Sequence, residues 1–135
     1  MKYISGIHAL NLNCNLETCG DWHQSSLIWT PIKFYESDDF IWKDYGIEKN
    51  VSIPEHHNTY SVANHIRALL DLLYLGNFAT AQGMNENYIG NNRYDEEIFS
   101  QVYRMKELTH WKKIDDFMMK EYRGKWNKYK KRKEL

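Results

Sequence analysis

Residues 62–73, which read VANHIRALLDLL, are the most strongly patterned stretch of the sequence. Its apolar side chains recur at the spacing that places them on one face of an α-helix. They are Val62, Ile66, Leu69, Leu70 and Leu73. Thr59 or Ser61 is a suitable N-terminal cap, and Gly76 can take the left-handed conformation that often follows a helix. The pattern therefore predicts a helix from Thr59 or Ser61 to about Leu75.

Helical periodicity continues from this stretch towards the C-terminus. The expected helices run from Phe78 to about Met84, from Tyr94 or Asp95 to Leu108, and from Thr109 onwards. The Asn-rich segment of residues 85–92 is expected to be a loop. Gly124 is a weak point in the last helix, because glycine costs about 1 kcal/mol relative to alanine in a helix interior.

Towards the N-terminus, aromatic and β-branched residues alternate with turn formers, which favours strands. The candidate strands are Tyr3 to Leu12, Ser26 to Tyr35 and Phe40 to Tyr45. Pro31 lacks a backbone N–H, so the second candidate should be an edge strand or two short strands. The predicted fold class is α+β, with a small N-terminal antiparallel sheet packed against about four C-terminal helices.

The length of 135 residues fits one domain. We expect residues 1–58 to be mainly strands and loops, residues 59–123 to be helical, and residues 124–135 to form a basic helical tail. Hydrophobic residues make up 42% of the chain, enough for a core, and no run is long enough to span a membrane. The N-terminal residues lack the apolar segment of a secretory signal, which makes the cytoplasm the expected location.

Charge is distributed unevenly although the formal net charge is zero. Residues 120–135 hold eight basic side chains against two acidic ones, so the first 119 residues hold 10 basic and 16 acidic side chains. A basic segment with interleaved aromatics can bind nucleic acid or an acidic partner. The candidate binding residues are Arg123, Lys125, Trp126, Lys128, Lys130, Lys131 and Arg132. The alternatives are a solvated helix end, or an amphipathic face that binds a partner or a second copy of the chain.

Two short segments combine histidines with carboxylates. Asp21 and His23 lie on either side of a tryptophan, and Glu55 precedes His56 and His57 just before the predicted helix. If the two loops meet, these side chains can supply a general base, a general acid and an orienting carboxylate. The alternative is that each has a structural role. His8 and His65 flank apolar faces, and we expect both to be hydrogen-bonded core histidines.

Cys14 and Cys19 are the only cysteines, and a disulfide is not expected in a cytoplasmic protein. Together with His23 they form a candidate zinc set, which His56 or His57 could complete. Structural zinc sites usually place cysteines in paired, closer spacings, so the main expectation is two packed thiols and no cofactor. A cysteine nucleophile near His23 is a further alternative.

Common catalytic motifs, including the phosphate-binding glycine loops and the serine nucleophile elbow, are missing. Three segments of the chain nevertheless resemble small bacterial proteins associated with mobile elements and with toxin–antitoxin or abortive-infection-like loci. These are Ile4 to Asn11, Thr18 to His23, and Val62 to Leu73 followed by Ala81 to Met84. The resemblance implies an antitoxin-like partner or an accessory factor, and no site residues come with it.

The leading hypothesis is therefore a non-enzymatic interaction or regulatory protein that binds another protein. A first alternative is a small histidine-dependent enzyme, hydrolase or nuclease-like, that acts on nucleic acid or a nucleotide. A second alternative is a nucleic-acid-binding regulator that uses its basic C-terminal helix.

Overall fold

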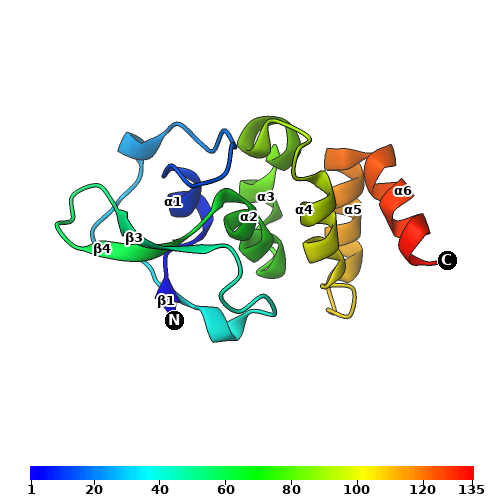
Figure 1. The fold of residues 1–135 in the computed structure, drawn as a ribbon, viewed down its shortest axis with the longest axis horizontal. Coiled ribbons are helices and arrows are strands. Elements are labelled where there is room, and N and C mark those ends of the chain that lie inside the picture. Colours follow the sequence, from blue (N-terminus) through cyan, green and yellow to red (C-terminus); the bar gives the residue numbers. More distant parts are fainter.

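Helix α2 (His65–Tyr74) lies at the centre of the molecule, between the N-terminal half of the chain and the last three helices (Figure 1). The computed structural model describes residues 1–135. The predicted helix is confirmed, but every residue from His65 to Leu73 is buried, not only the apolar stripe. Because both halves pack against α2, its polar side chains must find partners inside the protein.

Two small antiparallel sheets, each of two strands, lie in the N-terminal half, which confirms the α+β class. Strand β3 (Ile47–Ser52) pairs with β4 (Thr59–Ala63), with a bulge between Glu48 and Val51. Strand β1 (Lys2–Tyr3) pairs with β2 (Tyr35–Glu36). Ile4 joins the two sheets, since its N–H donates to Ser61 and its carbonyl accepts from Ala63.

The positions of the strands differ from the prediction. Only Tyr3 to Ser5 of the expected strand from Tyr3 to Leu12 are extended, because Gly6 has a φ of +63° and begins helix α1 (Gly6–Leu10). Of the second expected strand, Ser26 ends a one-turn helix, residues 27–34 are irregular and only Tyr35 lies in a strand, while residues 40–45 form turns. The expected start of the long helix is strand β4, and Asn64 is the cap, its side chain accepting from the Arg67 N–H at 2.8 Å.

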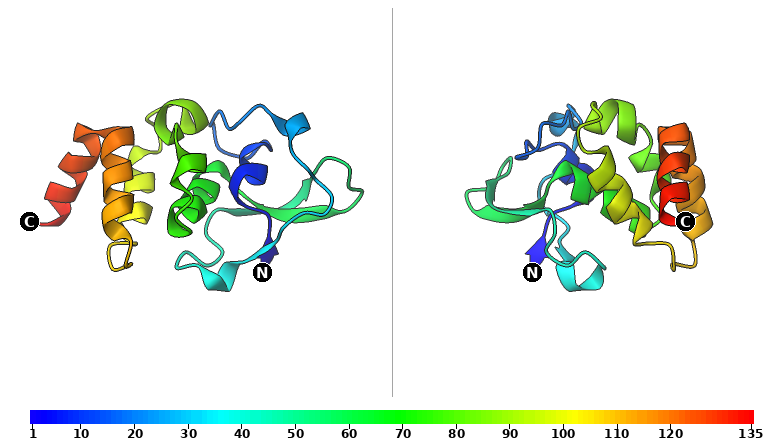
Figure 2. Two further views of the ribbon diagram at one scale, coloured as in Figure 1. Left: turned by 180° about the vertical axis from the view of Figure 1, so that it is seen from behind. Right: turned by 45° about the vertical axis from the view of Figure 1, so that its right-hand side comes forward.

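The later helices agree better with the prediction, although each is shorter. They are α3 (Phe78–Ala81), α4 (Asp95–Tyr103), α5 (Trp111–Tyr122) and α6 (Gly124–Lys133). The expected loop of residues 85–92 instead contains η3 (Met84–Ile89), a π-helical segment. The break before α6 falls at Arg123, whose φ is +53°, next to the predicted weak point Gly124. Figure 2 shows α6 lying along the outer side of α5.

A single cluster of 30 buried apolar residues extends from Tyr3 to Tyr129. Trp126 and Tyr129 of α6 belong to it, and the ring of Phe99 in α4 lies edge-on to Trp126 at 5.5 Å. Helix α6 is therefore part of the core and not a separate tail. No helix of the protein combines the length and the apolar character needed to cross a lipid bilayer.

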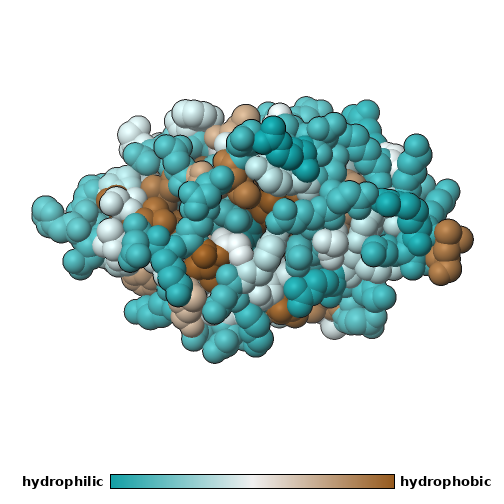
Figure 3. Space-filling view, in the orientation of Figure 1, coloured by the Kyte–Doolittle hydropathy of each residue, from teal (hydrophilic) through white to brown (hydrophobic).

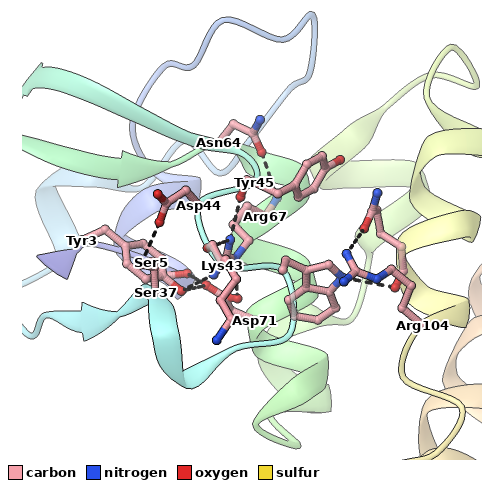
Figure 4. Close-up of polar contacts among 12 residues, drawn as sticks. Tyr3, Ser5, Ser37, Lys43, Asp44, Tyr45, Asn64, Arg67, Asp71 and Arg104 are labelled. Carbon is pink, nitrogen blue, oxygen red and sulfur yellow. Dashed lines mark hydrogen bonds and ion pairs between the residues drawn. The ribbon is translucent and has the colours of Figure 1, made fainter. Parts of the chain in front are cut away.

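Arg67 ties α2 to the N-terminal half (Figure 4). Its guanidinium is fully buried, and Nε donates to Asp71 at 2.8 Å. Nη1 donates to the carbonyls of Lys43 and Tyr45, both at 2.6 Å. These bonds hold the turn before β3 against α2.

The carboxylate of Asp71 is equally well satisfied. Its second oxygen accepts from the hydroxyls of Tyr3 at 2.6 Å and Ser5 at 2.7 Å. Burial and the charge of Asp71 raise the pKa of the Tyr3 hydroxyl, so it remains a donor. The start of the chain is thereby fixed to the central helix.

Candidate functional site

The loop of residues 13–24 follows α1 and closes against two other elements. The N–H of Gly20 donates to Tyr88 of η3 at 2.8 Å, and that of Asp21 donates to Leu10 of α1 at 2.7 Å. Gly20 has a φ of +68°, and a Cβ there would lie 2.7 Å from His65 Cε1 and from the Leu10 carbonyl oxygen. Only glycine fits this approach without movement of its neighbours.

Asp21 and His23, two of the predicted site residues, form a hydrogen-bonded pair. The distance from Asp21 Oδ1 to His23 Nδ1 is 2.5 Å, and because a carboxylate only accepts, the imidazole N–H donates. Asn11 supports both, since its amide donates to Asp21 Oδ2 at 3.2 Å and its oxygen accepts from the His23 N–H. Burial opposes ionisation of Asp21, but the hydrogen bonds from His23 and Asn11 prevail and lower its pKa.

Asp21 lines a pocket of about 250 Å³ beside this pair. The lining residues come from one stretch of chain and are Leu10, Asn11, Leu12, Asn13, Cys19, Asp21, Trp22 and Gln24. The pocket thus combines a carboxylate, amides, a thiol and an indole. It offers hydrogen bonding and stacking to a small polar group.

Two large apolar side chains, one of which lines this pocket, are exposed to solvent. Trp22 is 80% exposed and Ile28 is 74% exposed, and they lie on either side of η1 (Gln24–Ser26) in the sequence. We call residues 22–28 the η1 segment. On the face drawn in Figure 3 hydrophilic side chains dominate, and apolar atoms gather in patches mainly over the N-terminal half.

The second predicted group, at the tip of the β3–β4 hairpin, does not join this pocket. Both ring nitrogens of His56 are occupied: Nε2 donates to the Trp29 carbonyl at 2.6 Å, so Nδ1 accepts from the Tyr60 hydroxyl at 2.9 Å. His56 therefore pins the hairpin to the segment after η1. Glu55 and His57 are exposed and make no hydrogen bond or ion pair.

The candidate zinc ligands have separate partners. Cys14 is half-buried and its Sγ lies 3.6 Å from the Thr18 hydroxyl. Cys19 is exposed and lies beside Gly90, so the expectation of two packed thiols holds for Cys14 alone. His23 is bonded to Asp21. No group of three or more His, Cys, Asp or Glu side chains in the structure is arranged to hold a metal ion.

Cys14 has a histidine neighbour, but it is His65 and not His23. The Thr18 hydroxyl lies 2.6 Å from His65 Nδ1, and His65 Nε2 lies 2.7 Å from the Leu12 carbonyl oxygen. His65 is buried and hydrogen-bonded, as predicted. His8 is hydrogen-bonded to the Ile28 carbonyl, but it is only half-buried, so the expectation of a core histidine is wrong for His8. Sequence spacing could not pair Cys14 with His65, because the two lie 51 positions apart and only the folded loop joins them.

The basic residues of α6 are partly neutralised within the chain. Lys125 pairs with Asp95 at 3.2 Å, Lys130 with Asp115 at 2.7 Å, and Arg132 with Glu96 at 2.6 Å. The remaining candidates Arg123, Lys128 and Lys131 form no ion pair and are exposed. Trp126 is fully buried, so the expectation that it stacks on a nucleic-acid base is wrong for this conformation.

Comparison with known proteins adds no relative. No protein-family model, no curated protein and no solved structure matches the chain. The loop of residues 13–24, its pocket and the η1 segment are the features of the molecule that bear on function.

Proposed function

We propose that this chain is a non-enzymatic interaction protein that binds another protein through the η1 segment. The exposure of Trp22 carries the proposal. A tryptophan that is 80% exposed leaves a large apolar surface in water, and tryptophan is the residue type most enriched at the energetic centres of protein interfaces. Ile28 adds a second apolar contact at the other end of the segment.

The partner class follows from charge and from the resemblance. The first 119 residues carry an excess of acidic side chains, which favours a partner with a basic surface. The resemblance to proteins of toxin–antitoxin and phage-defence-type loci supports an antitoxin-like role, with the partner encoded by an adjacent gene. A cytoplasmic location fits the two free cysteines, because thiols stay reduced there.

The test is co-purification of the full chain with the product of the adjacent gene. We expect a stable complex in size-exclusion chromatography, and Trp22→Ala should weaken it by about 30-fold or more, the loss of an interface hot spot of about 2 kcal/mol. Met119→Ala removes another exposed apolar side chain, on α5, and should leave affinity unchanged. A chain that stays monomeric beside that product contradicts the proposal.

The Asp21–His23 pair supports a second candidate, a small hydrolase acting on a nucleotide or nucleic acid. The carboxylate orients the imidazole, and the Nε2 atom of a neutral His23 is then available as a base beside the pocket. Turnover of nucleotides or RNA oligomers that is lost in His23→Gln would support it. Equal turnover by wild type and variant would exclude His23 as the base.

A further inference from the structure

One cluster, between the loop of residues 13–24 and the start of α2, is not used by the proposed interaction. It consists of Cys14, Thr18 and His65. We propose that Cys14 is a reactive thiol that passes its proton through the Thr18 hydroxyl to His65, and that it forms mixed disulfides with low-molecular-weight disulfides. This proposal does not rest on the interaction function.

The direction of the relay follows from the hydrogen bonds of His65. Its Nε2 lies 2.7 Å from the Leu12 carbonyl, which can only accept, so Nε2 carries a proton. In the neutral ring Nδ1 is then an acceptor, and it receives the Thr18 hydroxyl at 2.6 Å. The Thr18 oxygen is left to accept from the Cys14 thiol at 3.6 Å. The carbonyl of Leu12 thus holds the imidazole in the tautomer that can take up a proton.

When the thiol is activated, a proton moves along each of the two hydrogen bonds of the Thr18 hydroxyl. The thiol proton moves to the Thr18 oxygen while the Thr18 proton moves to His65 Nδ1, which leaves a thiolate and an imidazolium. The thiolate attacks one sulfur of the small disulfide, a new S–S bond forms, and the old S–S bond breaks. The departing thiolate takes the proton back from the imidazolium, so the products are one mixed disulfide and one free thiol.

The electrostatics of the loop favour this ion pair. Burial alone would raise the pKa of Cys14, but the hydrogen bonds and charge of His65 and the Thr18 hydroxyl outweigh it and lower that pKa. Burial likewise opposes protonation of His65, yet Cys14 and the Leu12 carbonyl raise the pKa of the imidazole. A further charge that acts on His65 is that of Glu48 in β3, whose carboxylate accepts from the Asn15 N–H and also favours the imidazolium.

Access and an internal control are both present in the loop. Cys14 is partly exposed, and its neighbours Asn13 and Asn15 are exposed, so a small reagent can approach it. Cys19 is exposed and lies against Gly90, with no imidazole or hydroxyl partner. The two thiols of the same molecule therefore differ in whether a hydroxyl and an imidazole lie beside them, which is the feature that the experiment tests.

The experiment treats the full chain with oxidised glutathione from pH 5 to 10 and counts mixed disulfides at each cysteine by mass spectrometry. We expect Cys14 to react with a midpoint below about 8.5, the pKa of an ordinary thiol. Thr18→Val and His65→Gln should raise that midpoint and leave the profile of Cys19 unchanged. Thr18→Ser keeps the hydroxyl and should retain the wild-type profile.

Two results would overturn the proposal. One is a wild-type midpoint at Cys14 at or above that of an ordinary thiol, which requires no variant. The other is a Cys14 profile that is the same in Thr18→Val as in wild type. Thr18 lies in a loop and valine has the same shape, so this variant remains decisive if His65→Gln disturbs α2.

Discussion

Arg67 and Asp71 are the two charged side chains that the fold buries completely. Placing a guanidinium and a carboxylate in the interior costs several kcal/mol for each ion, and their attraction compensates only when the remaining donors and acceptors are bonded. Here the carbonyls of Lys43 and Tyr45 and the hydroxyl of Tyr3 take up most of those bonds. The pair therefore selects one arrangement of the N-terminal half on α2.

Removal of one partner of this pair should be strongly destabilising. Asp71→Asn leaves the buried Arg67 without a counter-charge, and we expect the free energy of unfolding to fall by about 3 kcal/mol in urea denaturation. Lys112 and Asp116 form a pair of the same i,i+4 spacing at the surface, with side chains 87% and 57% exposed. Asp116→Asn should cost less than about 0.5 kcal/mol. Equal losses in the two variants would contradict the role of burial.

The periodicity of residues 62–73 predicted this helix and its apolar face, but not its polar contacts. Apart from Asp71, the groups that bond to the Arg67 guanidinium lie 22 to 64 positions away in the sequence. The same holds for the candidate site: Asp21 and His23 are two positions apart, and the sequence paired them. Thr18 and His65 became neighbours only because Gly20 lets the loop approach α2.

Helix α6 is held to α5 by one carboxylate and a set of aromatic rings. Asp115 accepts from the Trp126 indole at 2.8 Å and from Lys130 at 2.7 Å. Burial opposes ionisation of Asp115, but these bonds and the charges of Lys130 and Lys112 lower its pKa. The sequence predicted the aromatic stripe, and the acidic residues that neutralise the basic end could be located only in the fold.

The lowered pKa of Asp115 predicts how acid weakens this contact. Its folded-state pKa lies below the unfolded value of about 3.9, so its contribution is complete above that value and is lost as the pH falls through the folded pKa. At pH 6 we expect Asp115→Asn to lower the free energy of unfolding by about 1 kcal/mol. The difference from wild type should shrink as the pH falls below 4. If urea denaturation showed the same difference in the free energy of unfolding between wild type and Asp115→Asn at every pH, the lowered pKa of Asp115 would be refuted.

The strands were harder to predict than the helices for a physical reason. The alternation from Tyr3 to Leu12 is typical of a strand. The segment is buried on several sides, however, so the spacing of its apolar residues does not distinguish a strand from a helix. Gly6, with its positive φ, turns this segment into α1. Strand β4 was hidden because its last residues, Val62 and Ala63, extend the helical pattern of α2 by one turn.

Contacts on both sides of α2 join the two halves of the molecule. The indole of Trp42 donates to Gln101 at 3.3 Å, Arg104 donates to the Ile41 carbonyl at 3.0 Å, and His110 bonds to the Leu73 carbonyl. Neither half has a core of its own, since the buried cluster is continuous. A two-stranded hairpin such as β3–β4 is barely stable in water without such packing.

This arrangement predicts that the chain unfolds as one unit. In native-state hydrogen exchange, the most protected amides of β4 and of α5 should open with free energies equal to within about 1 kcal/mol, and both should fall with urea at the same slope. The reason is that loss of either half exposes one face of α2, whose residues from His65 to Leu73 are all buried. If the amides of α4 to α6 exchanged through an opening of lower free energy while β3–β4 stayed protected, the protein would instead consist of two unfolding units that meet at α2.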